Sequence, residues 1–311
     1  MKKSLLFFLV LVLFSFFPLN SFSETLTLKD ALNRTVKIET PVKRAVFLVG
    51  YEIIPFLDLW HQTVGISLWA RYENDLLGNK VKSFVNVGTA SNPNIETIVS
   101  LKPDLVITWP YNQRVIQTLE SLGIPTYTIA PNSLKDLFSL IHDLALIFGK
   151  EKRGEKLIKL MRETLSELNS LVATAYKPGV IFTWGRPTRI SGKQGVVPDL
   201  IRIAGGKNLG DVFDRPYIDL SLERLVILNP EVIFIWGNAR YDAYYLLKDE
   251  RLSSIKAIKN KRVYKAPEWS TWSPRAVLIA LWMGTKLHPE VITQAFFQQK
   301  KAQLESFITN P

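Results

Sequence analysis

The sequence predicts an α/β protein of two similar lobes, each with a central parallel sheet, joined by one long α-helix and enclosing a ligand cleft between them. The main observation is a segment that occurs twice, as NIETIVSLKPDLVITW at 94–109 and SLERLVILNPEVIFIW at 221–236. In each copy, apolar residues at helical spacing precede an unbroken apolar run, which predicts a helix followed by a strand buried on both faces. The copies lie too far apart for a solenoid repeat of about 20–50 residues. Two related lobes explain them better.

The N-terminus predicts a secretory signal peptide over residues 1–23. Lys2 and Lys3 precede an apolar run from Leu5 to Phe17 and a small-residue pattern that ends at Ser23. A membrane anchor is the alternative, but the run is shorter than the roughly 20 residues that span a bilayer. The sequence contains no cysteine for a lipid anchor or a disulfide. We therefore expect an exported, unanchored protein of a Gram-negative periplasm.

The composition argues against several classes of function. The formal net charge is +11, but no block of basic residues is interleaved with aromatic residues, so we expect no nucleic-acid partner. An anionic small ligand explains the excess charge more economically, with general solubility as the alternative. The three histidines, His61, His142 and His288, are too scattered to predict a metal site. Nucleophile, P-loop, dinucleotide and zinc-protease motifs are missing, so we expect no enzyme; a two-lobed transferase is the alternative from another class.

The N-terminal lobe is predicted over residues 24–148. Its strands and helices alternate along the chain at a spacing that favours a parallel sheet. The expected elements are an entry hairpin around 36–38, a strand at 44–49, a helix at 53–60, a strand at 64–67, a polar and aromatic loop at 68–73, the first repeat copy, a helix to about 122, a strand at 124–129 and a helix at 134–148.

A connecting helix is predicted within residues 149–176. From Glu151 to Ala175 the apolar residues recur along one side, as Leu157, Met161 and Leu165 do. At about 1.5 Å per residue such a helix spans roughly 37 Å, the size of a small domain. It lies between the two repeat copies, which favours a strut that joins the lobes; an ordinary packing helix is the alternative.

The C-terminal lobe is predicted over residues 177–311. Ser273 followed by Pro274 indicates an N-cap with proline at the first helical position. The other expected elements are a strand at 180–184, a helix that ends at 205–206, the second repeat copy, a strand at 262–265, a helix to about 287 and a terminal helix after 290.

Candidate ligand contacts follow the predicted strands, because ligands of open α/β sheets bind beyond the carboxyl ends of the strands. Aromatic side chains supply flat apolar contacts, and arginines supply forked donors for anionic oxygens. Core packing is the alternative for the tryptophans, whereas a cation gains nothing from the dipole at the helix start where Arg275 lies. The set suits a bulky, partly aromatic or anionic ligand. Its members are Tyr51, Trp69, Arg71, Tyr111, Trp184, Arg186, Tyr241, Trp269 and Arg275.

The two repeat copies, LGIPTYTI, ISGKQGVVPDLIRIAGGKNL and WSPRAVLIALWMGTKLHPE together resemble the class III periplasmic substrate-binding proteins of ABC importers. This resemblance covers essentially the whole mature chain. It implies a ligand such as a ferric siderophore, haem, cobalamin, molybdate or tungstate, a permease dimer as partner and no cofactor of the protein's own. We expect a monomer.

The resemblance also assigns a role to Glu96 and Glu223, which occupy equivalent places in the two copies. In the family, glutamates at this position dock onto arginines of the permease. The alternative is purely local, because a first-turn glutamate complements the helix dipole by about 0.3–1 kcal/mol. A long loop at 69–77 favours a ferric siderophore over the corrinoid of the more compact cobalamin receptors. Cobalamin, haem and an oxyanion such as molybdate stay open as alternatives.

Overall fold

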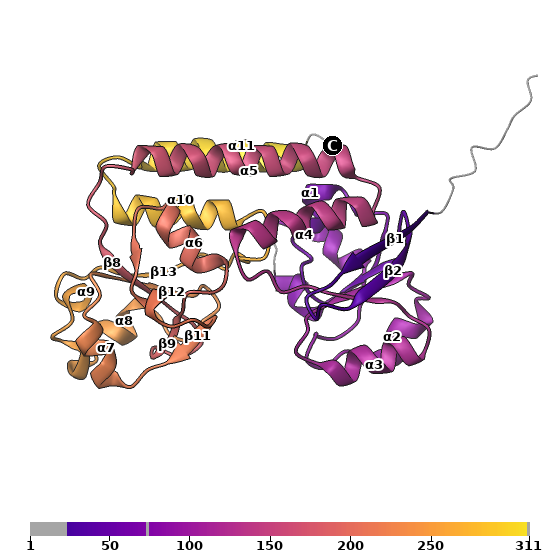
Figure 1. The fold of residues 1–311 in the computed structure, drawn as a ribbon, viewed down its shortest axis with the longest axis horizontal. Coiled ribbons are helices and arrows are strands. Elements are labelled where there is room, and N and C mark those ends of the chain that lie inside the picture. The colour runs from indigo at the N-terminus through magenta and orange to yellow at the C-terminus, as the bar shows by residue number, and fades with distance from the viewer. Residues whose placement is uncertain (1–23, 73–74, 310–311) are drawn as a thin grey trace, which may run out of the picture.

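The computed structural model describes residues 24–72 and 75–309. The predicted signal peptide, residues 1–23, lies outside the described residues. Two α/β lobes lie side by side beneath a layer of long helices (Figure 1). In the described part of the chain, no helix combines the length and the apolar character that crossing a membrane requires.

The N-terminal lobe contains the expected entry hairpin and a five-stranded parallel sheet. Its apolar strands are short and largely buried on both faces, as the unbroken apolar runs predict. The hairpin pairs β1 (Glu24–Lys29) with β2 (Thr35–Thr40). The sheet has the order β5-β4-β3-β6-β7, from β5 (Val85–Asn86), β4 (Thr63–Ile66), β3 (Ala45–Phe47), β6 (Leu105–Thr108) and β7 (Thr126–Thr128).

The helices of this lobe differ from the prediction in three places, one of which is the unpredicted 3-10 helix η2 (Gly78–Ser83). Helix α1 ends at Leu57 rather than Trp60, because Asp58 adopts the left-handed conformation that closes the helix. The segment predicted as a loop at 68–73 forms a 3-10 helix over Leu68–Tyr72. The bounds are α1 (Ile53–Leu57), η1 (Leu68–Tyr72), η2 (Gly78–Ser83), α2 (Ile95–Ser100), α3 (Gln113–Ser121) and α4 (Leu134–Ile147).

The C-terminal lobe has a six-stranded sheet in the order β11-β9-β8-β12-β13, with β10 also paired to β8. Strand β9 runs antiparallel to its neighbours β8 and β11, so this sheet is mixed rather than wholly parallel. The sequence did not predict this strand, which is only three residues long. The strands are β8 (Gly179–Thr183), β9 (Arg189–Ser191), β10 (Lys207–Asn208), β11 (Tyr217–Asp219), β12 (Val232–Ile235) and β13 (Val263–Lys265).

Short helices surround the outer part of this sheet, and two long helices cover its other side. The bounds are α6 (Val196–Ile203), η3 (Leu209–Val212), α7 (Leu222–Leu228), α8 (Ala243–Leu247), η4 (Glu250–Leu252), α9 (Lys256–Lys259), α10 (Ala276–Leu287) and α11 (Gln294–Thr309).

The duplicated segment forms the same structure in both lobes, as a helix (α2 or α7) that leads to a central strand (β6 or β12). The side chains of Asn94 and Ser221 cap the two helices by accepting hydrogen bonds from the backbone N–H three residues on. Each helix is followed by a residue in the left-handed conformation, Lys102 with φ 47° and Asn229 with φ 44°. The repeat therefore extends to the helix caps and the turn.

In each copy, an acidic residue follows the proline that both copies share, and its carboxylate binds the start of the neighbouring strand. Asp104 accepts hydrogen bonds from the backbone N–H groups of Lys43 and Arg44, at the start of β3. Glu231 accepts one from Gly179 N, at the start of β8. Both lobes thus use a carboxylate to fix the entry of a central strand.

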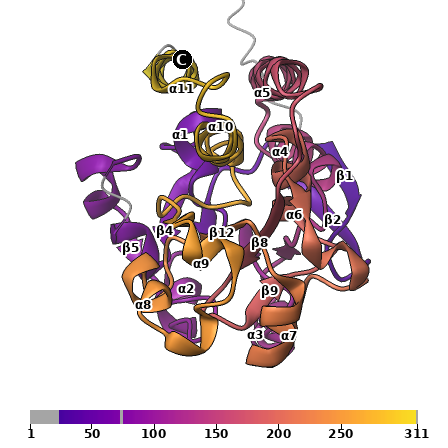
Figure 2. The same ribbon diagram turned by 90° about the vertical axis from the view of Figure 1, so that its left-hand side faces the viewer.

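Helix α5 (Glu151–Leu171) extends from the N-terminal lobe to the C-terminal lobe, and α11 returns in the opposite direction (Figures 1 and 2). Arg153, on α5, donates hydrogen bonds to the carbonyls of Phe56 on α1 and Phe307 on α11. The final helix of the predicted C-terminal lobe therefore packs on the N-terminal lobe. Helix α5 ends four residues before the predicted Ala175.

Helix α10 is buried along nearly its whole length and belongs to a core cluster that includes residues of both lobes, such as Phe47, Phe234 and Met283. The helix begins at Ala276, and Arg275 occupies the N-cap position, so the prediction of Ser273 as N-cap is wrong. The Ser273 hydroxyl still accepts a hydrogen bond from Arg275 N at 3.1 Å, and it donates one to Glu52 of the other lobe.

Candidate functional site

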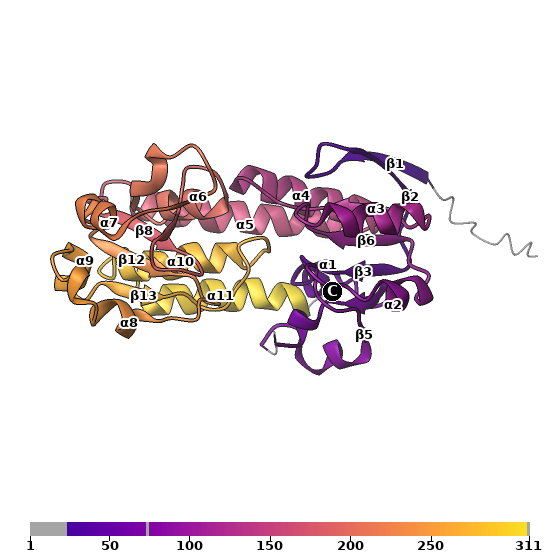
Figure 3. The ribbon, with the colours of Figure 1, turned by 90° about the horizontal axis from the view of Figure 1, so that it is seen from below.

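The carboxyl ends of both sheets face the boundary between the lobes. The segment after β7 meets the start of α6, where Gly195 N donates to the Asn132 carbonyl at 2.6 Å. Two residues after Asn132, Leu134 N donates to a carboxylate oxygen of Asp199, on α6, at 2.7 Å. Seen from below in Figure 3, the two lobes lie side by side, with α5 extending from one to the other. The segments that follow the strands therefore hold the candidate site.

Glu52, directly after Tyr51 at the end of β3, is only 1% exposed and binds groups of the other lobe. Its carboxylate accepts hydrogen bonds from Ser270 N at 3.0 Å and from the Ser273 hydroxyl at 2.5 Å. The Arg275 Nε lies 3.4 Å from the same carboxylate. Burial raises the pKa of Glu52, and Arg275 and Ser273 oppose that shift. Sequence reasoning missed Glu52, because no pattern marks a glutamate whose partners lie more than 200 residues away.

Arg275 and Trp269, two predicted ligand contacts, lie together in this inter-lobe network. Arg275 is only 4% exposed, its Nη1 lies 3.0 Å from an Asp75 carboxylate oxygen, and its guanidinium lies 5.4 Å from the Trp269 ring centroid. The Trp269 indole N–H points to the same carboxylate at 3.4 Å and its ring stacks on Phe297. The arginine therefore joins the two lobes, and its contact with a ligand stays a prediction.

Arg186 and Arg189 converge on one carboxylate in the C-terminal lobe. Arg189 Nη2 lies 2.7 Å from an Asp219 oxygen, and Arg186 Nη2 lies 3.0 Å from the other. The hydrogen bond from Arg189 lowers the pKa of Asp219, against a small opposing effect of burial. The Arg189 guanidinium also lies 5.1 Å from the centroid of the Tyr217 ring.

Arg189, Tyr217 and Asp219 were missed because they belong to the antiparallel pair β9–β11, which places Asp219 directly opposite Arg189. The signal available in the sequence was weak. Each strand is only three residues long, with a single isoleucine between two polar or aromatic residues.

Tyr111, after β6, approaches this group from the N-terminal lobe. It is 67% exposed and its ring meets Trp109 edge-on at 5.8 Å. Partial burial, followed by the proximity of Tyr217, raises the pKa of Tyr111. Tyr111 is therefore an exposed aromatic side chain beyond the carboxyl end of β6.

Trp184 and Tyr241 belong to an aromatic cluster at the carboxyl end of the C-terminal sheet. The Trp184 indole N–H donates to the Ser191 hydroxyl at 3.0 Å, and its ring lies 5.7 Å from that of Trp236. The Tyr241 hydroxyl donates to the Trp184 carbonyl at 2.7 Å. Burial is the main cause that raises the pKa of Tyr241 to about 12. Both predicted residues are therefore half-buried and held by hydrogen bonds.

The remaining predicted ligand contacts lie in the N-terminal lobe. Tyr51 is half-buried against the core cluster. Trp69 is exposed, and its ring lies 5.9 Å from that of Tyr72. Arg71 is exposed and forms no hydrogen bond or ion pair within residues 24–72 and 75–309. The structure does not bring Trp69 and Arg71 into contact with the other candidates.

Glu96 and Glu223 lie exposed in the first turns of α2 and α7. Both helices lie on the side of the molecule opposite α5 and α11 (Figures 1 and 2). The pKa of Glu223 is lowered by a hydrogen bond with Ser221. Neither glutamate forms an ion pair with another described residue.

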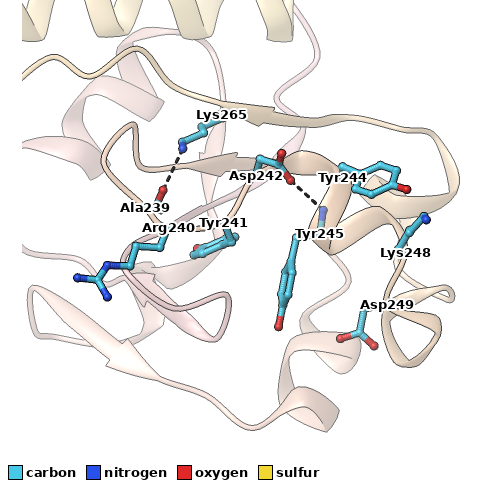
Figure 4. A pocket seen from close by; sticks show the side chains of 9 residues that line it. All are labelled: Ala239, Arg240, Tyr241, Asp242, Tyr244, Tyr245, Lys248, Asp249 and Lys265. Carbon is cyan, nitrogen blue, oxygen red and sulfur yellow. Dashed lines mark hydrogen bonds between the residues drawn. The ribbon is translucent and has the colours of Figure 1, made fainter.

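The described residues contain no group of three or more histidine, aspartate or glutamate side chains arranged to hold a metal ion. Surface cavities between the described residues include the following two. One of about 540 Å³ lies between α4 and α5, lined by residues such as His142 and Arg162. The other, of about 780 Å³, lies beside α8 in the C-terminal lobe and includes Tyr241 (Figure 4).

Comparisons with known proteins extend over both lobes. A family model described as periplasmic binding protein matches residues 46–268. The Bacillus subtilis protein YvrC, an uncharacterized ABC transporter substrate-binding lipoprotein, is 26% identical over 282 residues, which cover 86% of this chain and 87% of YvrC. Because that relative is a lipoprotein, the expectation of an unanchored chain stays a prediction.

Two relatives have ligands in their names or titles. The molybdate-binding protein MolA of Haemophilus influenzae is 26% identical over 302 residues, which cover 84% of each chain. The crystal structure of Helicobacter pylori CeuE in its Ni–His complex matches with a TM-score of 0.81 at 26% identity, covering 92% of this chain and 95% of that one. The family-model match over residues 46–268 includes both copies of the duplicated segment and the helices between them.

Proposed function

The chain belongs to the periplasmic binding proteins, in the class III group that serves ABC importers, and we propose that it captures an anionic metal chelate, a ferric siderophore, between its lobes. It then delivers this chelate to the importer's permease. The relatives are transport proteins, which supports a binding role rather than a catalytic one. We place the mature protein in the periplasm.

The positive charge on the C-terminal side of the proposed site carries the proposal. We call this side, formed by Arg186, Arg189 and Asp219, the C-terminal wall. Arg186 and Arg189 share the single carboxylate of Asp219, which leaves one positive charge without compensation. Arg186 is largely exposed, so an anionic ligand can reach it without displacing a buried group. Guanidinium groups bind catecholate and carboxylate oxygens through paired hydrogen bonds.

The aromatic residues support a ligand of some size. Tyr111 follows β6 of the N-terminal lobe and Tyr217 lies in β11 of the C-terminal lobe. Trp184 and Trp269 follow β8 and β13 of the C-terminal lobe. Aromatic rings with polar groups suit a ligand that combines flat apolar surfaces with polar oxygens. The nickel complex of the Helicobacter relative further supports a metal that is carried with an organic ligand.

A free oxyanion such as molybdate is the second candidate. Arg186 and Arg189 are positioned to bind a tetrahedral anion in place of Asp219. The similarity to the molybdate-binding protein supports this alternative. Cobalamin and haem, which the sequence also left open, are outcomes of the same experiment.

We propose further that Glu96 and Glu223 dock onto the permease dimer. Their exposure on one side of the molecule, one in each lobe, suits a partner with two equivalent halves. The absence of an ion-pair partner for either glutamate among the described residues leaves both available to cations of a partner.

The experiment is a ligand titration of the protein lacking residues 1–23, followed by tryptophan fluorescence. The probes are the ferric complex of a tris-catecholate chelator, sodium molybdate, cyanocobalamin and haemin. We expect saturable quenching by the ferric chelate with a Kd below about 1 μM. Arg186→Ala with Arg189→Ala should weaken that binding at least tenfold. Arg162→Ala, in the cavity between α4 and α5, is the control and should leave it unchanged.

Each outcome assigns the ligand differently. Tight binding of molybdate with no response to the ferric chelate selects the oxyanion. Preference for cyanocobalamin or haemin overturns the siderophore assignment and selects that macrocycle. Ferric-chelate binding that is insensitive to the double arginine variant refutes the role given to the C-terminal wall.

A further inference from the structure

The proposed function gives no role to the cavity of about 780 Å³ beside α8, which is lined by tyrosines and cationic side chains. We call it the tyrosine pocket, and it is lined by Arg240, Tyr241, Tyr244, Tyr245, Lys248 and Lys265, with Ala239, Asp242 and Asp249 (Figure 4). It lies at the carboxyl ends of β12 and β13. This is the same edge of the sheet on which Trp184 and Trp269 lie.

The acidic side chains of the tyrosine pocket already have partners. Asp242 caps α8 by accepting a hydrogen bond from Tyr245 N at 3.0 Å. The Asp249 carboxylate is bound by the Arg251 guanidinium at 2.7 Å. The charge of Asp249 is therefore balanced by Arg251, whereas Asp242 keeps its negative charge at the N-terminus of α8.

Arg240 and Lys248, two cations of the pocket, have no carboxylate partner among the described residues. Lys265 donates to the Ala239 carbonyl at 2.9 Å. The Lys248 Nζ lies 4.4 Å from the centroid of the Tyr244 ring. The pocket therefore favours an anion.

Aromatic surface is the other notable property of the tyrosine pocket. Tyr244 is 62% exposed and Tyr245 is 56% exposed, and neither hydroxyl has a hydrogen-bond partner among the described residues. The ring of Tyr245 lies 5.9 Å from that of Tyr241. Exposed phenol rings with free hydroxyls offer stacking and hydrogen bonds to a planar ligand.

The segments that follow β12 and β13, from which most of the tyrosine pocket is built, pack closely together. At Gly237 the segments after β12 and β13 pack so closely that an added Cβ would lie 2.4 Å from the Pro267 carbonyl oxygen. The Tyr241 hydroxyl is bonded to the Trp184 carbonyl, next to the segment that carries Arg186. The pocket is thus connected to the C-terminal wall of the proposed site by fixed backbone.

We propose that the tyrosine pocket binds a planar aromatic anion of the catecholate or aromatic carboxylate class, as a second contact for an arm of the captured chelate. The inference rests on the proposed function for its biological ligand. The iron-free ring is a sufficient probe of the pocket itself, so the two assignments can be tested separately.

The experiment titrates 2,3-dihydroxybenzoate without iron into the protein lacking residues 1–23, by calorimetry. Cyclohexanecarboxylate, which has the same charge and a saturated ring but no aromatic system and no phenol hydroxyls, is the ligand control. We expect the aromatic acid to bind with a Kd below about 1 mM and the aliphatic acid at least tenfold more weakly.

The variants locate the binding. Arg240→Ala with Lys248→Ala should weaken binding of the aromatic acid at least tenfold, and Tyr245→Leu about fivefold. All three positions are exposed, so the fold should tolerate the changes. Lys256→Ala with Lys259→Ala, a pair of exposed cations on α9, is the matched control and should have no effect.

Three results would overturn the inference. The first is no binding of the iron-free ring while the ferric chelate binds, which leaves the proposed function intact. The second is binding that is lost in the Arg186→Ala, Arg189→Ala variant but kept in Arg240→Ala, Lys248→Ala. The third is equal binding of the aliphatic acid. By contrast, ring binding in the pocket with no ferric-chelate binding refutes the proposed function alone.

Discussion

The Glu52 carboxylate of the N-terminal lobe accepts a hydrogen bond from the Ser273 hydroxyl of the C-terminal lobe at 2.5 Å. Both side chains are buried, and Arg275 lies against the same carboxylate. The lobes are therefore joined by polar groups at the base of the proposed site as well as by the helices that run between them.

Replacing Glu52 by alanine should destabilise the protein strongly. The change leaves the buried Arg275 with one carboxylate fewer and removes the acceptor of Ser270 N and Ser273. We expect the free energy of unfolding to fall by about 3 kcal/mol, as for a broken buried ion pair. Urea denaturation at pH 7 measures it. The exposed Glu268→Ala should change stability by less than about 0.5 kcal/mol; equal effects of the two substitutions would contradict the assignment.

Asp30 should contribute to the loss of stability in acid. It accepts a hydrogen bond from the Thr128 hydroxyl at 2.7 Å and pairs with Arg34, which ties the entry hairpin to β7. Burial acts to raise its pKa, but the bonds to Arg34 and Thr128 outweigh that effect, so the pKa in the folded state is lowered. Its contribution is therefore present at neutral pH and is lost as the pH falls below about 4, through the folded-state pKa.

Asp30→Asn should accordingly be less stable than the parent at pH 7 and approach it near pH 2. Urea midpoints across this range test the expectation. Asp214→Asn, at an exposed acid without a cationic partner among the described residues, should run parallel to the parent. A constant gap between Asp30→Asn and the parent at all pH values would show that the Asp30 carboxylate does not titrate in this way.

Gly237→Val should disturb the loop that carries Trp269. The new side chain would begin 2.4 Å from the Pro267 carbonyl oxygen, so the backbone must move. We expect a loss of about 1–3 kcal/mol and a shift in tryptophan emission. Gly185→Ala is the control, because an added Cβ there meets no atom within 4 Å. Unaltered stability and emission in Gly237→Val would refute the close approach.

Charge reversal at both Glu96 and Glu223 should abolish uptake of the labelled ferric chelate by cells while its affinity for the purified protein stays unchanged. The reason is that both residues are exposed, away from the groups assigned to the ligand. Glu155→Lys with Glu163→Lys, on α5, is the matched control and should support normal uptake. Normal uptake by the Glu96→Lys, Glu223→Lys variant would remove the docking role.

Local sequence patterns predicted most of the fold. The two repeat strands were found because their apolar runs are buried on both faces, and α5 because its apolar residues recur on one side. Strands β9 and β11 were missed, since three residues are too few to show a period. The predicted start of α10 was two residues too early, because residues 273–275 form a turn before the helix begins at Ala276.

The candidate site was less accessible to prediction. The rule that ligands lie beyond strand ends selected Tyr111, Trp184 and Trp269 at the correct edge of each sheet. It could not reveal that Arg275 is buried between two acids, or that Asp219 is shared by two arginines. These are pairings between distant segments, which no local pattern encodes.

The core cluster that surrounds α10 has a thermodynamic consequence. Side chains from both lobes bury one another around this helix, so neither lobe retains its apolar contacts once the other has unfolded. Although the outline suggests two bodies, heat should melt the protein cooperatively, in a single calorimetric transition whose van't Hoff and calorimetric enthalpies agree. The lobes are separate in shape and form one unit in unfolding.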